Sequence, residues 1–269
     1  MYKHLLVGHD LSVEADLAVR RAAQLARQHG ARVTLVHLIE EYFPPAMLAT
    51  VREAALMALR DSAASAGLEA RTVIVQERAA RGMVATVEAQ GADLLIIGAH
   101  HQQLFERFEG TTLERVVRQC PVPVLMAVSE QPTAYRQAVC GLDFSVSASN
   151  AWRGACELLG KNTDLLAVQA CEPGNDLEET QLYLERQRPL LEQLLHDESR
   201  RVQGALPHLK CLLSALPPQQ ALERALDEYP TSDLLVLGSR SRSAVHDLLL
   251  GSTARHFLQR PPCDMLLSR

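Results

Sequence analysis

The chain has 269 residues, of which 47% are hydrophobic and 22% are charged, and its formal net charge is −5. This composition is ordinary for a globular protein, and the length suits two domains of roughly 130 residues each. The mildly acidic balance and the lack of a Lys/Arg run argue against a nucleic-acid-binding face.

The first half of the chain alternates short apolar runs with amphipathic stretches. The apolar runs predict buried parallel strands at residues 4–7, 32–38, 71–75, 94–97 and 122–128. Helices are expected between them: one capped by Ser12 and ended by Gly30, one opened by Pro44 and Pro45, and two over residues 82–90 and 112–119.

The second half repeats this order. Strands are expected near residues 137–141, 164–170, 209–215, 233–237 and 263–268. Trp152 lies on the apolar face of the helix that follows the first of these strands, which indicates a packing role. Pro189 falls inside a helical stretch over residues 176–202, and we expect it to kink or split that helix.

Two segments have nearly the same sequence, which indicates that the chain contains an internal duplication. Residues 92–98 read Ala-Asp-Leu-Leu-Ile-Ile-Gly and residues 232–238 read Ser-Asp-Leu-Leu-Val-Leu-Gly. Alternation of strand and helix predicts an α/β fold, here two tandem repeats of a five-stranded parallel sheet with helices on both faces. We expect domains over residues 1–128 and 137–269, joined by the linker 129–136.

The loop after residue 238 contains the candidate ligand-binding residues. Gly238 and Gly251 are thirteen residues apart (251 − 238 = 13), and Ser252 and Thr253 follow. In this the chain resembles the universal stress protein family, whose nucleotide-binding branch has the signature Gly, two residues, Gly, nine residues, Gly, Ser or Thr. The resemblance covers both halves and implies a Rossmann-like fold related to the adenine nucleotide alpha hydrolases.

The signature has a physical basis. The first glycine lets the chain turn off the strand and lets a ribose approach the backbone. The last glycine and Ser252 open a helix whose free N–H groups and dipole attract phosphate. The resemblance therefore implies a nucleotide site in the second domain made of Gly141, Asp143, Val168, Ala170, Leu237, Gly238, Ser241, Gly251, Ser252 and Thr253. A weaker copy in the first domain comprises Gly8, Asp10, Leu38, Gly98, Gly110, Thr111 and Thr112.

Individual residues have competing interpretations. By the resemblance, Asp143 contacts the nucleoside and Val168 and Ala170 line the adenine pocket. The alternative for Asp143 is a turn or helix-start aspartate, and Ser145 reads as a helix cap rather than a ligand contact. His37, at the end of a strand, reads as a hydrogen-bonded structural histidine.

Departures from the signature distinguish the two copies. Ser241 and His101 replace the middle glycine. In the first copy the glycines are one residue closer (110 − 98 = 12), and the loop carries Glu106 and Glu109, which would repel phosphate. In the second copy Arg240, Arg242 and His246 add positive potential, so the second copy is the stronger candidate.

Three functions remain open. The first is a stress-response protein that binds ATP, with Mg²⁺ as an accompanying ion, and acts by nucleotide-gated signalling or protection, with no catalytic residue and at most slow hydrolysis. The second is an interaction module that binds no nucleotide and works through protein pairing. The third and weakest is an enzyme of the alpha-hydrolase superfamily, since the chain has no adenylation signature. His100 and His101 lack a third ligand, so no metal site is expected.

The resemblance, the cysteine spacing and the hydropathy of the chain also predict its partners and location. The resemblance implies pairing of the two domains through their fifth strands (residues 122–128 and 265–268), and a homodimer is a further expectation. Six cysteines without C-x-x-C spacing indicate reduced core thiols. No apolar run approaches the roughly 20 residues of a membrane span, and the N-terminus reads as a strand rather than a signal peptide, so we expect a cytoplasmic protein.

Overall fold

The computed structural model of the chain describes residues 1–39, 43–99, 112–171, 176–239 and 250–269. By their contacts these residues form two compact units, an N-terminal unit over Tyr2–Ala134 and a C-terminal unit over Tyr135–Arg269 with Met1. No helix in the described ranges combines the length and the apolar character needed to cross a bilayer.

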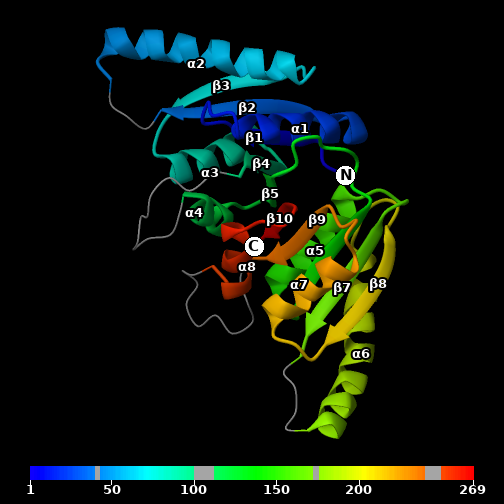
Figure 1. Cartoon of the computed structure of the whole chain (residues 1–269). Helices are drawn as coiled ribbons and strands as arrows, with labels where there is room; N and C mark the ends of the chain where they lie inside the picture. The colour runs from blue at the N-terminus through cyan, green and yellow to red at the C-terminus, as the bar shows by residue number, and fades with distance from the viewer. Residues whose placement is uncertain (40–42, 100–111, 172–175, 240–249) are drawn as a thin grey trace. The chain divides into compact units, whose positions relative to one another are not determined.

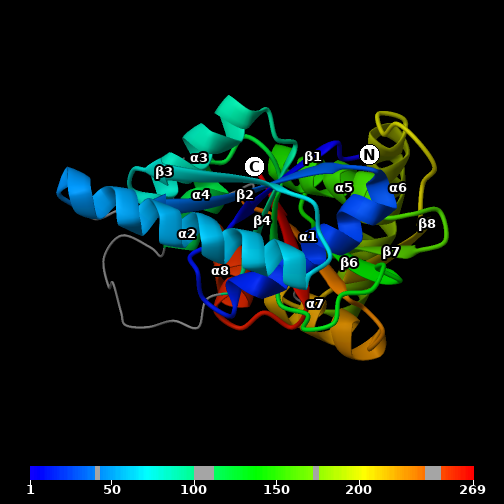
Figure 2. The same ribbon diagram turned by 90° about the horizontal axis from the view of Figure 1, so that it is seen from above.

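The N-terminal unit is a five-stranded parallel sheet with helices on both faces (Figure 1). Neighbouring strands follow the order β3-β2-β1-β4-β5. Helices α1 and α2 cover one face, and α3 and α4 cover the other (Figure 2). The elements are β1 (His4–Gly8), α1 (Ala15–His29), β2 (Arg32–Ile39), α2 (Pro45–Ser65), β3 (Arg71–Gln76), α3 (Ala79–Gln90), β4 (Leu94–Gly98), α4 (Thr112–Gln119) and β5 (Val124–Ala127).

The C-terminal unit repeats this topology. Its parallel strands follow the order β8-β7-β6-β9-β10, with α5 and α6 on one face and α7 and α8 on the other. The predicted fold class is therefore confirmed in both halves. The elements are β6 (Gln137–Leu142), α5 (Val146–Leu158), β7 (Asp164–Ala170), α6 (Leu177–Ser199), β8 (His208–Ser214), α7 (Pro218–Glu228), β9 (Leu234–Gly238), α8 (Ser252–Gln259) and β10 (Asp264–Ser268).

Continuous apolar strands explain the architecture, because a strand covered by helices on both faces must be apolar on both. Leu5, Leu6 and Val7 of β1 are fully buried, as are Leu234 and Leu235 of β9. The expected packing role of Trp152 is confirmed, since its side chain is 1% exposed.

Two helices match the prediction only in part. Helix α1 begins at Ala15, three residues after Ser12. Helix α6 runs through Pro189 without being split. The residues around Pro189 are exposed, so water can hydrate the Glu185 carbonyl that the proline leaves without an N–H donor.

The six cysteines are all free thiols. Burial raises the pKa of Cys156 and of Cys263 to about 12, and it also raises the pKa of Cys140 and Cys171. These thiols therefore stay protonated and unreactive near neutral pH. Cys211, on β8, is partly exposed.

Candidate functional site

Five residues of the predicted C-terminal site lie at the carboxyl ends of three adjacent strands, β9, β6 and β7. Gly141 of β6 is in register with Val168 of β7, and Leu237 of β9 lies on its other side. Ala170 ends β7, and Gly238 ends β9. The sheet thus brings them to the edge at which open α/β sheets bind ligands.

These residues differ in accessibility. Val168 and Leu237 are only 2% and 4% exposed. A Cβ atom added to Gly141 would lie 2.9 Å from Cδ2 of Leu237 and 3.4 Å from Cδ1 of Leu222 on α7. The strand ends around Gly141 are therefore packed against α7, whereas Ala170 is partly exposed at the carboxyl end of β7.

The loop between β6 and α5 is organised by Asp143. Its Oδ1 atom accepts the backbone N–H of Ser145 at 3.0 Å, and Phe144 between them has a φ of 60°. The Ser145 hydroxyl accepts the N–H of Ala148 at 3.1 Å, which confirms the predicted cap of α5. Asp143 thus has a turn role, which leaves room for a ligand because a carboxylate can accept several hydrogen bonds.

The N-terminal unit builds the same turn with Asp10. Oδ1 of Asp10 accepts the Ser12 N–H at 3.0 Å and the Ser12 hydroxyl at 2.5 Å, and Leu11 has a φ of 69°. Ser12 accepts the N–H of Ala15 at 3.2 Å, although the capping residue of α1 is Glu14. An aspartate side chain that closes a turn stabilises a neighbour in the sparsely populated left-handed region.

The glycines that end the fourth strand of each unit are required by the fold itself. A Cβ atom on Gly98 would lie 2.5 Å from the carbonyl oxygen of Glu14, at the start of α1. One on Gly238 would lie 2.7 Å from the backbone N of Ala148, at the start of α5. Both glycines therefore allow a helix N-terminus to press against the strand, a steric cause separate from the predicted approach of a ribose.

The N-terminus of α8 is the helix start that the sequence predicts to face phosphate. Gly251 precedes the helix, and its N–H donates to the carbonyl of Ser239 at 3.0 Å, which holds the helix start at the end of β9. Ser252 and Thr253 form the first turn, which contains no acidic residue and which no side chain of the described residues caps. Ser239 was not predicted; it is fully buried, and its hydroxyl has no hydrogen-bond partner in the described part of the chain.

The corresponding N-terminal site is less favourable. Thr112 is the exposed first residue of α4, and Glu114 places an acidic side chain in the first turn, where it competes with an anion. A Cβ atom on Gly8 would lie 2.7 Å from Cε of Met83, and Leu38 is half-buried above Gly82. The strand ends are thus covered by α3, much as those of the C-terminal unit are covered by α7, so the difference between the two sites lies in the first turn of α4.

Several predicted residues lie outside the described ranges. They are Ser241, Gly110 and Thr111 of the two sites, and the loop residues His100, His101, Glu106, Glu109, Arg240, Arg242 and His246.

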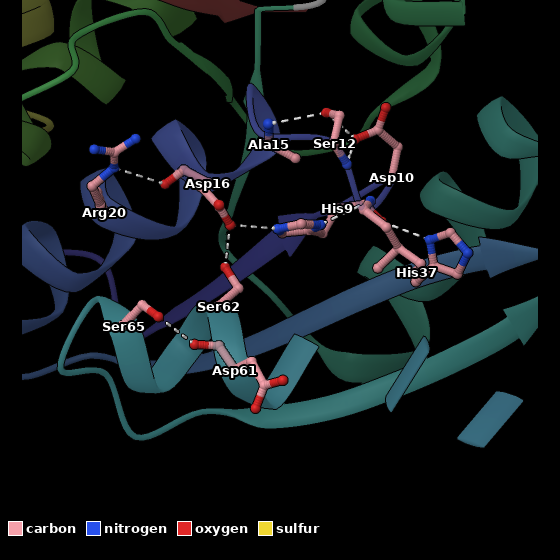
Figure 3. Close-up of polar contacts among 11 residues, drawn as sticks. His9, Asp10, Ser12, Ala15, Asp16, Arg20, His37, Asp61, Ser62 and Ser65 are labelled. Carbon is pink, nitrogen blue, oxygen red and sulfur yellow. Dashed lines mark hydrogen bonds and ion pairs between the residues drawn. The ribbon is translucent and has the colours of Figure 1, made fainter. Parts of the chain in front are cut away.

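A partly buried polar network in the N-terminal unit was missed by sequence reasoning (Figure 3). His9, only 5% exposed, directly follows β1, and its Nε2 lies 3.1 Å from Oδ1 of Asp16 on α1. The Ser62 hydroxyl of α2 donates to the same carboxylate oxygen. His37 is structural, as predicted, because its Nδ1 lies 2.8 Å from the carbonyl oxygen of His9.

These contacts determine the protonation pattern of His9. Its Nδ1 accepts the backbone N–H of Leu11 at 2.9 Å, so this nitrogen carries no proton. The proton of the neutral ring therefore sits on Nε2 and is donated to Asp16. Through these two bonds His9 connects α1 to the turn that carries Asp10. The sequence contains one signal of this network: His9 of the first copy stands where the second copy has Leu142.

Replacing His9 with leucine tests this role. His9→Leu removes both ring hydrogen bonds and leaves the Leu11 N–H without its partner, so the free energy of unfolding should fall by about 2 kcal/mol. Urea unfolding at neutral pH measures it. His208→Leu, at a histidine whose side chain is 71% exposed, is the matched control and should change stability by less than about 0.5 kcal/mol. Equal effects of the two substitutions would contradict the role of the network.

Comparison with known proteins agrees with this geometry. The model of the universal stress protein family matches residues 1–127 and again residues 134–269. A universal stress protein of Mycolicibacterium smegmatis is 26% identical over 292 aligned residues, which cover 98% of this chain and 96% of that protein. One of Thermus aquaticus is 27% identical over 135 residues, 47% of this chain and 98% of that protein.

The fold agrees with a solved structure as well. The crystal structure of a universal stress protein from Archaeoglobus fulgidus superposes with a TM-score of 0.73 at 17% identity, covering 99% of this chain and 98% of that one. Because the family match spans both halves of the sequence, the chain belongs to the universal stress protein family, with two copies of the family domain in tandem.

Proposed function

We propose that this protein binds ATP or a related adenine nucleotide in its C-terminal unit and acts as a nucleotide-gated signalling or protective factor in the stress response. The observation that carries the proposal is the start of α8. It is held at the carboxyl end of β9 by the Gly251 N–H, its first turn contains no acidic residue, and no side chain in the described part of the chain caps it. Free N–H groups and the helix dipole favour a phosphate there.

One further feature supports the same site. Asp143 directly follows β6, and the partly exposed Ala170 ends β7, on the side where the nucleoside would extend from the phosphates. In this arrangement Ser252 and Thr253 would contact phosphate, Asp143 would accept a hydrogen bond from the nucleoside, and Mg²⁺ would accompany the phosphates.

The asymmetry between the units supports one nucleotide per chain. Glu114 lies in the first turn of α4, whereas the first turn of α8 contains no acidic residue. The shorter and more acidic loop of the first copy acts in the same direction. We therefore assign nucleotide binding to the C-terminal unit and a structural or other ligand-binding role to the N-terminal unit.

Titration of the intact chain with ATP and Mg²⁺ in a calorimeter tests this assignment. We expect one ATP per chain, together with a rise in melting temperature that grows with ATP concentration. Mass spectrometry of the freshly purified protein should identify an adenine nucleotide. No heat of binding, no thermal shift and no co-purified nucleotide would contradict the proposal.

One observation favours the alternative, an interaction module without nucleotide. Ser241 and His101 stand in the sequence where the signature has its middle glycine, and a side chain at a position that requires glycine would disfavour phosphate binding in both copies. In that case the fifth strands would mediate pairing of domains 1–128 and 137–269, or of two chains, in the cytoplasm. A failed ATP titration combined with a concentration-dependent dimer in analytical ultracentrifugation would favour this function.

A further inference from the structure

His9 connects a buried, titratable ring to the turn between β1 and α1. Its two ring nitrogens have different partners: Nδ1 accepts the Leu11 N–H at 2.9 Å inside the turn, and Nε2 donates to Asp16 on α1 at 3.1 Å. Histidine is the side chain whose charge ordinarily changes between about pH 8 and about pH 5. A change of charge on this ring therefore acts directly on the turn.

The second proton of a charged His9 ring has to bind Nδ1, because Nε2 carries the proton of the neutral ring. Nδ1 would then be a donor that faces another donor, the N–H of Leu11, at hydrogen-bond distance. Two donors repel each other, so the charged ring does not fit the present shape of the turn. Protonation of Nδ1 and the hydrogen bond from Leu11 exclude each other.

The backbone of Leu11 favours the release of this bond. Leu11 has a φ of 69°, in the left-handed region that a residue with a branched side chain rarely adopts. Such a conformation persists only where neighbouring contacts hold it. The bond to His9 is one of these contacts, and the bond from the Ser12 N–H to Oδ1 of Asp10 is another. Loss of the first contact therefore allows the turn to relax.

Two titratable groups bond to His9 from neighbouring elements (Figure 3). Asp16 of α1 bonds to Nε2, which keeps its proton whether or not Nδ1 is protonated, so this bond does not choose between the two shapes of the turn. His37 of β2 donates from Nδ1 to the carbonyl oxygen of His9. A second proton on His37 would bind its Nε2 and leave that bond intact, so the response has to come from His9.

The other charged side chains around the network are at its exposed rim. Arg20 of α1 is exposed and donates from Nε to the backbone oxygen of Asp16. Asp61 of α2 is also exposed, and Figure 3 shows its carboxylate directed away from His9. Asp10 is the exposed carboxylate of the turn itself. Carboxylates ordinarily titrate at lower pH than histidine, so they keep their charge while the ring gains its proton.

The C-terminal unit contains the same turn without the ring. Leu142 stands at the position of His9, and residues 141–149 include no histidine. Oδ1 of Asp143 accepts the Ser145 N–H at 3.0 Å, and Phe144 has a φ of 60°. The chain therefore carries its own comparison: one turn that is linked to an imidazole and one that is not.

We propose that the turn between β1 and α1 is a pH-sensitive switch of the N-terminal unit. In acid, a proton from water binds Nδ1 of His9, the Leu11 N–H loses its acceptor, and residues 10–14 rearrange, which moves Asp10 at the carboxyl edge of the sheet. The proton reaches the buried ring when the turn opens, and the charged ring then prevents closure. Because the open turn binds one proton more than the closed turn, a fall in pH shifts the population toward the open turn.

Nitrogen-15 NMR of the intact chain tests the switch. From about pH 7.5 to about pH 5 the His9 ring should change from the neutral form with its proton on Nε2 to the charged form. With the intrinsic pH dependence of exchange removed, the Leu11 amide should then exchange about fivefold faster, the effect of one hydrogen bond. The Ser145 amide, in the turn without a histidine, should keep its protection.

Three results would overturn the proposal. They are a His9 ring that stays neutral over this pH range, a charged ring with unchanged protection of the Leu11 amide, and equal changes at Leu11 and Ser145. The last result would indicate a general effect of acid on the protein. None of these measurements depends on nucleotide, so the switch is tested separately from the proposed function.

Two asparagine variants identify the ring that responds. In His9→Asn the amide oxygen takes the position of Nδ1, accepts the Leu11 N–H and does not titrate, so the protection of Leu11 should be the same at both pH values. His37→Asn keeps a donor at the position of its Nδ1 and is the matched control, which should retain the response of about fivefold. A response that persists in His9→Asn, or that disappears in His37→Asn, would refute the assignment to His9.

Discussion

Gly238→Ala and Gly98→Ala should each lower the free energy of unfolding by about 3 kcal/mol. The added methyl group would lie 2.7 Å from the backbone N of Ala148 in the first variant and 2.5 Å from the carbonyl oxygen of Glu14 in the second. Both obstacles are backbone atoms at a helix start, which cannot rotate away as a side chain can. The helix must move off the strand, and the packing beneath it is lost.

Chemical denaturation followed by circular dichroism measures the effect. Gly160→Ala is the control, because a Cβ atom there meets nothing within 4 Å, and its stability should change by less than about 0.5 kcal/mol. Gly141→Ala should fall between them, since its close neighbour at 2.9 Å is the flexible end of Leu237. If Gly238→Ala proved as stable as Gly160→Ala, the proposed steric role of the glycine would be wrong.

The expected loss of stability in Gly238→Ala limits which substitutions can test nucleotide binding. Gly238 is the first glycine of the signature, and its substitution is an obvious way to examine binding. A variant that disturbs the contact between α5 and β9 would lose nucleotide whether or not Gly238 contacts the ligand. The test therefore has to be made at a position where the fold tolerates a side chain.

Much of the fold was predictable because it rests on local and repeated signals. Apolar runs that end in glycine, such as residues 94–98, predict buried parallel strands, and the duplicate at 234–238 provides an independent reading of the same element. The cap at Ser145 and the buried Trp152 are also local features, set by residues within one helical turn.

What the sequence did not reveal depends on contacts between distant segments. The bond from Ser62 to Asp16 joins residues 46 positions apart, and no spacing rule connects them. In the same way, the need for glycine at position 98 arises from the backbone of Glu14, on another element. Residue types at a strand end predict a candidate site, but helix packing decides which of them, such as Val168, are buried in the core.

Gly251→Val should lower ATP affinity by at least about a hundredfold, a loss of ~2.7 kcal/mol, while the protein stays folded. Gly251 has a φ of −58° and a ψ of 144°, a conformation that valine adopts readily, and it is partly exposed. The branched side chain would nevertheless stand at the start of α8, over the N–H groups proposed to hold the phosphates. Calorimetric titration measures affinity, and urea unfolding verifies the fold.

Gly110→Val, the same change at the corresponding signature position of the first copy, is the matched control. If ATP binds in the C-terminal unit, this variant should keep wild-type affinity, because the site it alters is the one with Glu114 in the first turn of the following helix. A loss confined to Gly110→Val would transfer the site to the N-terminal unit. Unchanged affinity in Gly251→Val would instead remove the start of α8 from the site, and with it the physical basis for placing ATP there.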